Sequence, residues 1–357
     1  MQKRLSLLSL ALLAALASTT MLASCGGNKS GGAADSTAAA SSNTLTGAGS
    51  TFINPIMTNW ASEYQKADSV AVNYQAVGSG AGINNLIDHT VDFAGSDAPM
   101  NPDELARAKA PVIHVPAVIG AVCVAYNVGG MASGLKLTSD AIAGIFLGKI
   151  TYWDDKAIKS QNAGMKLPHA KIFTAHRSDG SGTTAIFTDY LSKVSADWKS
   201  KVGQGKTVNW PEGGIGGKGN AGVAEVLKQH DNSIGYVELA YAEQNKIAYA
   251  SVQNSSGNFI APSVDGAAAA AAAFAMPDNM TSMITNSSAP QGYPITGFSW
   301  IITWKDSPKA DMVKKFISWI TTTGQADCKA LYYAPIPQSA AAAVAAQLTS
   351  AAPTAAK

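Results

Sequence analysis

Charge is scarce in this sequence, and its two signs nearly cancel. Charged residues make up 14% of the chain, and Lys3 and Arg4 account for the whole excess of 26 basic over 24 acidic side chains. No cluster of basic residues occurs. A nucleic acid is therefore not expected as a partner, because proteins that bind one carry a basic patch or stripe. An anionic ligand would have to be held by local geometry rather than by net charge.

Residues suited to metal or redox chemistry are also few. The chain has three cysteines and five histidines, and the histidines show neither H-x-x-x-H nor H-E-x-x-H spacing. No metal and no cofactor are therefore predicted. An oxidising compartment would permit a disulfide between Cys123 and Cys328. Cys123 lies in an apolar run typical of a strand, where a free buried cysteine is the commoner outcome, so the sequence leaves this pairing open.

The apolar run near the start of the chain is too short to span a membrane. Leu5–Ala17 follows two basic residues, as in a secretory signal. Leu22-Ala23-Ser24-Cys25 resembles the lipobox of bacterial lipoproteins, in which the cysteine receives a diacylglyceryl group before cleavage. Ordinary cleavage with Cys25 as a bystander is the alternative. We predict a signal peptide over 1–24, a lipid on Cys25 and a flexible tether over 25–43.

From residue 45 the chain alternates strand-like runs with helical patterns. Val70–Val77 reads as a strand, apolar residues at helical spacing follow at Ile83–Ile87, and Val313–Ile320 marks the expected last long helix. Asn101–Glu104 has the cap, proline and acid of a helix start. The alternation predicts an α/β fold, and the length indicates two domains of roughly 150 residues each.

Two apolar segments, Val115–Tyr126 and Ile295–Thr303, are longer than a mean strand and lack a helical period. They are either central core strands or crossovers between two lobes. In the second case they must lie side by side. The alanine-rich stretches 267–273 and 340–356 favour helix but offer little to bury, so each is expected to be a surface helix or a frayed tail.

Three glycine-rich turns with hydroxyl residues each precede a predicted helix. They are Gly47–Phe52, Gly78–Gly82 and Asp179–Thr184. A helix start leaves about four N–H groups without partners and carries roughly half a positive charge. Because glycine lets the backbone approach closely, each turn is suited to hold an anion. Each turn alone is more simply an ordinary cap, but three together indicate a convergent anion site.

Two charged side chains accompany these turns. Arg177 is suited to grip two oxygens of an oxyanion at once, or to pair with Asp179 at the surface, and the two roles are compatible. Asp97 would repel an anion unless that anion carries a proton to donate. Hydrogen phosphate does so, whereas sulfate near neutral pH does not. Asp97 would thus select phosphate, although alone it reads as a turn or cap residue.

Other motifs fit less well. Gly214–Gly219 matches G-x-G-x-x-G, but Trp210-Pro211 precedes it instead of a buried strand, so no dinucleotide site is expected. Ser79 or Ser181 would be the nucleophile of a serine hydrolase. Neither lies in G-x-S-x-G, and His176 has no evident third partner. The chain is therefore not predicted to be an enzyme.

Several segments together resemble the motifs of Pst-type phosphate-binding proteins, and the likeness runs in order from about residue 44 to 340. The main segments are Thr46–Phe52, Asn73–Gly80, Val91–Pro99, Arg177–Thr184, Gly216–Asn220 and Ile234–Glu238. This family is the substrate-binding component of an ABC phosphate importer. The resemblance implies a type II periplasmic binding-protein fold, with a ligand cleft between two lobes and two hinge strands.

The same resemblance implies a set of phosphate ligands. The expected binding residues are Thr51, Phe52, Ser79, Asp97, Arg177, Ser181, Gly182 and Thr183. Asp179 is expected to hold Arg177, and the two long apolar segments become the hinge. Lobe I would join residues 45–120 to 296–340, lobe II would be residues 121–295, and 341–357 would be an alanine-rich tail.

In function, the resemblance implies a monomer, and Leu22-Ala23-Ser24-Cys25 predicts that it is lipid-anchored on the periplasmic or cell-surface side of a bacterial membrane. It would hand inorganic phosphate to the permease subunits of the importer. A receptor for sulfate, molybdate or another tetrahedral oxyanion is the first alternative, against which Asp97 argues. A secreted phosphate-ester hydrolase is the enzyme alternative, and a purely structural lipoprotein would leave the three turns unexplained.

Overall fold

The computed structural model describes residues 43–274, 277 and 280–350. The predicted signal peptide, Cys25 and all but the last residue of the predicted tether lie outside these residues. The strands are β1 (Thr44–Gly49), β2 (Ala71–Ala76), β3 (Phe93–Ser96), β4 (Val112–Asn127), β5 (Lys136–Leu137), β6 (Phe173–Arg177), β7 (Ile215–Gly217), β8 (Ser233–Glu238), β9 (Ala248–Tyr249), β10 (Ser251–Gln253), β11 (Phe259–Ile260) and β12 (Thr296–Trp304).

Helices alternate with these strands, as the sequence predicts. They are α1 (Asn54–Asp68), α2 (Ser79–Ile87), α3 (Pro102–Ala108), α4 (Ser139–Phe146), α5 (Lys156–Lys159), α6 (Gly182–Val194), α7 (Ala196–Lys201), α8 (Gly219–Gln229), α9 (Leu239–Gln244), α10 (Val264–Ala272), α11 (Ala310–Thr321) and α12 (Gln338–Ser350), with 3-10 turns η1 (Thr323–Asp327) and η2 (Lys329–Leu331). The expected cap of α3 is present, since Asn101 and Glu104 form both hydrogen bonds of a capping box.

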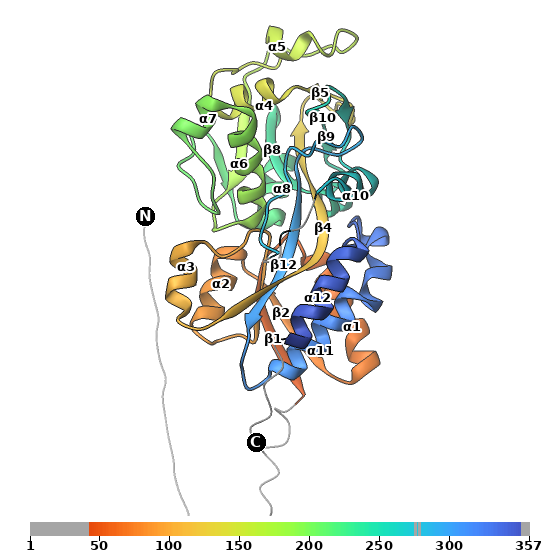
Figure 1. Cartoon of the computed structure of the whole chain (residues 1–357). Coiled ribbons are helices and arrows are strands. Elements are labelled where there is room, and N and C mark those ends of the chain that lie inside the picture. Colours follow the sequence, from red (N-terminus) through yellow and green to blue (C-terminus); the bar gives the residue numbers. More distant parts are fainter. Residues whose placement is uncertain (1–42, 275–276, 278–279, 351–357) are drawn as a thin grey trace, which may run out of the picture. The chain divides into compact units, whose positions relative to one another are not determined.

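The main sheet has the strand order β2-β1-β3-β12-β4-β8-β6-β7, with β9 also paired to β4. At one end β1 runs parallel to β2 and β3, and at the other β6 runs parallel to β7 and β8. The long strands β4 and β12 lie between the two parallel sets and are antiparallel to each other (Figure 1). The two apolar segments are therefore side by side, which is the arrangement that crossovers between two lobes require.

Strand β4 changes its partner halfway along its length. Val112–Ala121 pairs with β12, and Val122–Asn127 pairs with β8. Every residue of β12, and all but the two end residues of β4, are buried. A strand whose two faces are both covered reads as a continuous apolar run, which explains why neither segment shows a period in the sequence.

The two parallel sets direct their carboxyl ends toward a common region. The turns after β1, β2 and β3 enter α1, α2 and the segment before α3, while those after β6 and β7 enter α6 and α8. Loops beyond the carboxyl ends of parallel strands are the usual ligand sites of open α/β sheets. The fold thereby brings together turns that are more than a hundred residues apart in the chain.

Two expectations about the end of the chain and its alanine runs were wrong. The last long helix is α12, which follows α11, and it buries Ala340 and Val344. Helix α10 is not a plain surface helix, because Ala267 and Ala271 are buried in a cluster with Phe298 of β12. Alanine buries little area, but its small side chain lets a helix lie close against the long strands.

The described part of the chain contains no disulfide, no cluster of metal ligands and no helix suited to span a membrane. Cys123 and Cys328 are free and buried, so the disulfide left open by the sequence is not formed. Within the described ranges, no three His, Cys, Asp or Glu side chains are placed to hold a metal ion. No helix in that same part of the chain has the length and apolar character needed to cross a membrane.

Candidate functional site

The first turn connects β1 to α1. Ser50, Thr51 and Phe52 are buried there, and α1 starts at the N-cap residue Ile53 without a side-chain capping hydrogen bond. The N–H of Phe52 donates to Oγ of Ser50 over 2.9 Å. Capping alone therefore does not explain the hydroxyl residues of this turn.

The second turn connects β2 to α2 and depends on a glycine. Gly78 is the N-cap residue of α2 and has φ +98°, a conformation that glycine adopts without strain. A Cβ on Gly78 would lie 2.3 Å from Oδ2 of Asp179, which belongs to the third turn. The second and third turns are thus in direct contact, although the chain separates them by about a hundred residues.

The third turn connects β6 to α6, and here the capping interpretation is correct. Oγ of Ser181 accepts the N–H of Thr184 over 3.0 Å. The hydroxyl hydrogen of Ser181 can still donate to another group. A Cβ on Gly182 would lie 2.6 Å from Oγ of Ser79 and from the Asp97 backbone N and Oδ2. Only glycine allows α6 to start so close to the second turn and to Asp97.

Asp97 follows β3 and is 1% exposed. Oγ of Ser50 donates to its two carboxylate oxygens over 2.6 and 2.7 Å, and the hydroxyl of Ser299 donates to Oδ1. Burial raises the pKa of Asp97 from 3.8 to about 6, against the opposing effect of the serine hydroxyls and the charge of Arg177. Asp97 is therefore a shielded acceptor surrounded mainly by neutral donors.

Arg177 ends β6 and is 4% exposed. Its Nε and Nη2 atoms donate to the two carboxylate oxygens of Asp179 over 2.8 and 2.5 Å, and Nη1 donates to Oγ1 of Thr183 over 3.2 Å. Burial would raise the pKa of Asp179, but the hydrogen bonds and charge of Arg177, with the N–H of Gly219, hold it below its ordinary value. The bidentate pair fixes the plane of the guanidinium.

A fourth turn, between β7 and α8, joins the site and was not predicted to do so. The N–H of Gly219 donates to Oδ1 of Asp179 over 3.0 Å. The backbone and side-chain N–H groups of Asn220 donate to Oγ1 of Thr51 over 3.1 and 3.0 Å, and Nδ2 also reaches Oγ1 of Thr183 at 3.1 Å. The G-x-G-x-x-G match, Gly214–Gly219, was not expected to bind a ligand. It contains the short strand β7 and ends at Gly219, which is part of the site.

Two serines of the site, Ser50 and Ser299, were not predicted from the sequence. Ser50 lay inside a quoted motif but was given no role. Ser299 is on β12, and its neighbour Trp300 pairs with Ser96 of β3. The antiparallel register therefore places Ser299 opposite Asp97, and this pairing of distant strands cannot be read from the sequence. A serine inside an apolar strand was the only available signal.

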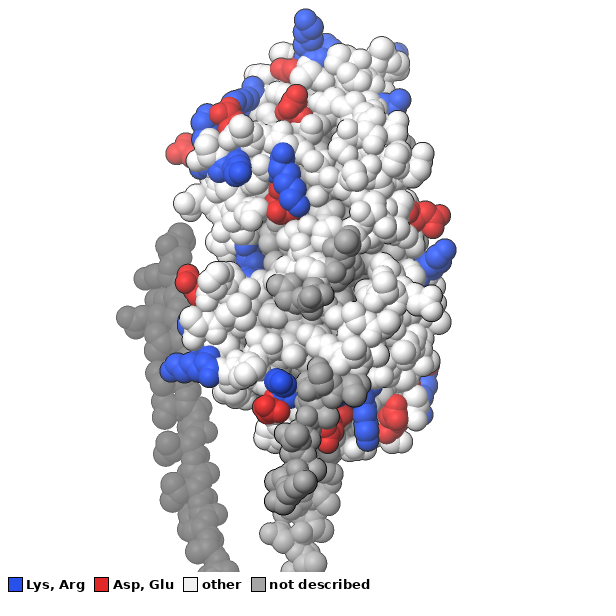
Figure 2. Space-filling view, viewed as in Figure 1, with Lys and Arg blue, Asp and Glu red and all other residues white. Residues whose placement is uncertain are grey.

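The four turns contact one another through hydrogen bonds between the two parallel sets of strands. The N–H of Gly80 donates to the carbonyl of Gly180 over 2.9 Å, and the N–H of Gly182 donates to Oγ of Ser79 over 3.1 Å. The turns and strand ends that carry the predicted phosphate ligands are thereby brought to one place. Figure 2 shows that Lys and Arg are interspersed with Asp and Glu on the face drawn there, so no patch of one charge covers that face.

Comparisons with known proteins define the class of protein first. The model of the PBP superfamily domain matches residues 34–323. A high-affinity periplasmic phosphate-binding protein, PfluDING, solved with bound phosphate, superposes with a TM-score of 0.69 at 23% identity, covering 85% of this chain and 93% of the other. A phosphate-bound putative phosphate ABC transporter substrate-binding protein from Clostridium perfringens superposes with a TM-score of 0.59 at 19% identity, covering 83% and 100%. The fold is therefore that of the type II periplasmic binding proteins, as predicted.

Sequence relatives define the family. The phosphate-binding protein PstS of Xylella fastidiosa (strain Temecula1) is 44% identical over 299 residues, which cover 82% of this chain and 81% of that protein. The PstS proteins of Pasteurella multocida and Methanocaldococcus jannaschii are 44% and 38% identical, covering 83% and 78% of this chain and 87% and 78% of those proteins. The chain belongs to the PstS family of phosphate-binding proteins, which confirms the resemblance seen in its motifs.

Proposed function

We propose that this protein binds inorganic phosphate outside the cytoplasmic membrane and delivers it to an ABC-type permease. The observation that carries the proposal is the convergence of the helix starts of α1, α2, α6 and α8 on one arginine and one shielded aspartate. Helix starts and Arg177 supply the positive potential that a phosphate needs, and Asp97 supplies an acceptor for its proton. The named relatives bind phosphate, which supports the same function here.

In this proposal, each of the first three turns contributes ligands to the anion, and the fourth turn holds Asp179, Thr51 and Thr183 in place. Thr51 and Ser79 donate hydroxyl hydrogens, and Phe52 and Gly182 donate backbone N–H groups. The remaining ligands are Asp97, Arg177, Ser181 and Thr183, and Asp179 keeps Arg177 in place. Hydrogen bonds that these groups make to one another would be exchanged for bonds to phosphate oxygens. A dianion is costly to bury unless its oxygens are hydrogen-bonded, and the four turns offer donors from several directions.

We further propose that binding proceeds by closure of two lobes. Lobe I comprises residues 45–120 and 296–340, and lobe II comprises residues 121–295. The partner change of β4 between Ala121 and Val122 supports a boundary near residue 120. Strands β4 and β12 would flex as the hinge, so that the turns of lobe I and lobe II meet around the anion.

The lipid anchor is part of the proposal as well. Cys25 would carry the lipid, residues 25–43 would form the tether, and the protein would act as a monomer beside the permease subunits. The support is the lipobox-like Leu22-Ala23-Ser24-Cys25. An anchored binding protein stays close to its transporter, and a tether permits it to reach the permease.

Isothermal titration of the purified mature protein with phosphate, sulfate and p-nitrophenyl phosphate tests this function. We expect tight binding of phosphate and far weaker binding of sulfate, because only phosphate can donate a proton to Asp97. Equal binding of sulfate would instead support a general oxyanion receptor. Release of p-nitrophenol would support the hydrolase alternative, and an absence of heat with all three would overturn the proposal.

A further inference from the structure

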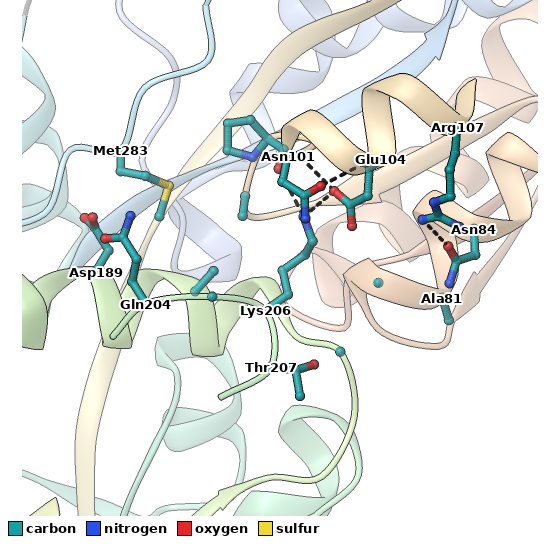
Figure 3. Close-up of a pocket in the computed structure, with 16 residues that line it drawn as sticks. Ala81, Asn84, Asn101, Glu104, Arg107, Asp189, Gln204, Lys206, Thr207 and Met283 are labelled. Carbon is teal, nitrogen blue, oxygen red and sulfur yellow. Dashed lines mark hydrogen bonds and ion pairs between the residues drawn. The ribbon is translucent and has the colours of Figure 1, made fainter. Parts of the chain in front are cut away.

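Lys206 connects the two proposed lobes at the edge of the site. It lies in the loop after α7, and its carbonyl accepts the N–H of Ser181 over 2.8 Å, so the loop supports the start of α6. Its side chain extends to α3, as Figure 3 shows. Lys206 and α3 line a cavity of about 740 Å³ beside the site, together with Gly80 and Gly180.

The ammonium group of Lys206 has two hydrogen-bond partners in the proposed lobe I. Nζ lies 2.7 Å from Oε2 of Glu104 and 3.1 Å from the carbonyl oxygen of Pro99, two residues after Asp97. The side chains of Lys206 and Glu104 are 11% and 10% exposed. The same Oε2 atom accepts the N–H of Asn101 in the capping box of α3. The carboxylate of Glu104 therefore has a cation as its partner and also accepts a backbone hydrogen bond.

The Lys206–Glu104 ion pair differs from most other ion pairs in the described part of the chain because it joins the two proposed lobes. Most of those pairs join residues within lobe I or within lobe II as proposed above. Lys329–Asp265 also crosses the boundary, but over 3.8 Å and with both side chains mostly exposed. An exposed pair contributes little. A shielded pair is different, because losing one partner leaves a charge without compensation.

We propose that Lys206 and Glu104 form a latch that stabilises the closed arrangement of the two lobes and thereby slows the release of the bound anion. The inference rests on the proposed binding of phosphate by closure. When the lobes separate, both charges return to water, so the pair favours the closed form alone. Neither side chain is among the proposed phosphate ligands, so the latch should act equally on every anion that closes the cleft.

Kinetic measurements on four variants test the latch. Lys206→Met removes the ammonium and keeps most of the length of the side chain. Glu104→Gln removes the charge, and glutamine still serves in a capping box. The double variant removes both charges, and Lys329→Met is the control for an exposed pair across the same boundary. The rate of phosphate dissociation is measured by stopped flow, the affinities for phosphate and sulfate by titration, and the fold by circular dichroism and thermal melting.

We expect each single change to raise the dissociation rate on the order of tenfold, or about 1.4 kcal/mol. The double variant should be faster than the parent by much less than the product of the two single effects, because the charges act as a pair. Lys329→Met should match the parent. The ratio of phosphate to sulfate affinity should stay constant in all four.

Three outcomes would overturn the latch. Parent-like dissociation in Lys206→Met and Glu104→Gln, with phosphate still bound by the parent, would show that the pair does not hold the lobes together. Independent effects of the two changes would show that each acts through local structure. A changed phosphate-to-sulfate ratio would place Lys206 against the anion. If Lys206→Met does not fold, Glu104→Gln decides the question. A parent protein that binds no phosphate would instead refute the proposed function.

Discussion

Asp97 and Asp179 are the same residue type on opposite sides of one site, and their surroundings shift their pKa values in opposite directions. Asp97 is buried among the hydroxyls of Ser50 and Ser299, which are neutral donors, and its pKa rises to about 6. Asp179 is shielded too, but it pairs with Arg177, and its pKa falls below the ordinary range. Burial makes a charged carboxylate costly, and the hydroxyls around Asp97 offset that cost only in part, whereas the hydrogen bonds and charge of Arg177 reverse it for Asp179.

The contrast assigns different tasks to the two carboxylates. Asp179 is committed to the guanidinium and keeps its plane fixed toward the site. Asp97 has no cation in direct contact, so it is well placed to accept a proton-bearing ligand. One lobe would thus recognise the charge of the anion, and the other would recognise its proton.

Replacing Arg177 should have the largest effect on phosphate affinity, because it removes the cation that distinguishes the surroundings of Asp179 from those of Asp97. Truncating one partner of a buried charged pair costs about 2–5 kcal/mol, so Arg177→Ala should weaken phosphate binding strongly. Titration calorimetry measures the change. Arg107→Ala is a matched control, since the guanidinium of Arg107 bonds to Asn84 outside the proposed ligand set. An unchanged dissociation constant in a folded Arg177→Ala variant would remove Arg177 from the site.

Replacing Asp97 by asparagine should act on selectivity. A hydrogen bond to a charged group is worth about 1.5–3 kcal/mol. Sulfate has no proton to make that bond, and its charge repels the carboxylate. Asp97→Asn should therefore narrow the preference for phosphate, chiefly by admitting sulfate. Competition binding with both anions decides it, and a variant that rejects sulfate as fully as the parent would place selectivity elsewhere.

The raised pKa of Asp97 also predicts an effect on stability without ligand. Because the folded protein holds this proton up to about pH 6 and the ordinary value is 3.8, the folded state binds more protons between these pH values. The contribution of Asp97 to stability should therefore fall as the pH rises from about 4 to 6. An asparagine at this position cannot titrate. The melting temperature of Asp97→Asn should therefore rise relative to that of the parent as the pH increases from about 4 to 6. A constant difference in melting temperature would contradict the raised pKa.

Asn220 tests whether the fourth turn belongs to the site. Asn220→Ala removes side-chain hydrogen bonds to Thr51 and Thr183, and a typical hydrogen bond contributes about 1 kcal/mol. Phosphate binding should weaken modestly, because two proposed ligands lose their orientation. Asn59→Ala is the control, since Asn59 bonds to Asp327 outside the site. Equal affinities of the two variants would assign Asn220 to folding alone.

The smallest effect on binding is expected at Cys25. Cys25→Ser should leave phosphate affinity unchanged, because all proposed ligands lie beyond residue 50. It should move the protein from the membrane fraction to the soluble fraction, since several acyl chains are needed for stable anchoring. Fractionation followed by immunoblotting measures this. Equal membrane association of parent and variant would contradict a lipid on Cys25.

Local chemistry in the sequence was enough to predict much of this protein. The α/β alternation, the turns that precede α1, α2 and α6, and the position of Arg177 beside the third turn all follow from residue types and spacing. Glycine, hydroxyl residues and helix starts act within a few residues of one another, so a linear pattern records them. The family motifs added the expected fold and its hinge.

Tertiary structure decided what depends on distant segments. Ser299 reaches Asp97 because β12 pairs with β3, which ends directly before Asp97, and Asn220 reaches Thr51 because β7 pairs with β6. Lys206 meets Glu104 across 102 residues of sequence. The alanines of α10 are buried because they fit against the long strands. Each of these contacts depends on how sheets and helices pack, and a linear pattern carries no record of which distant residues will become neighbours.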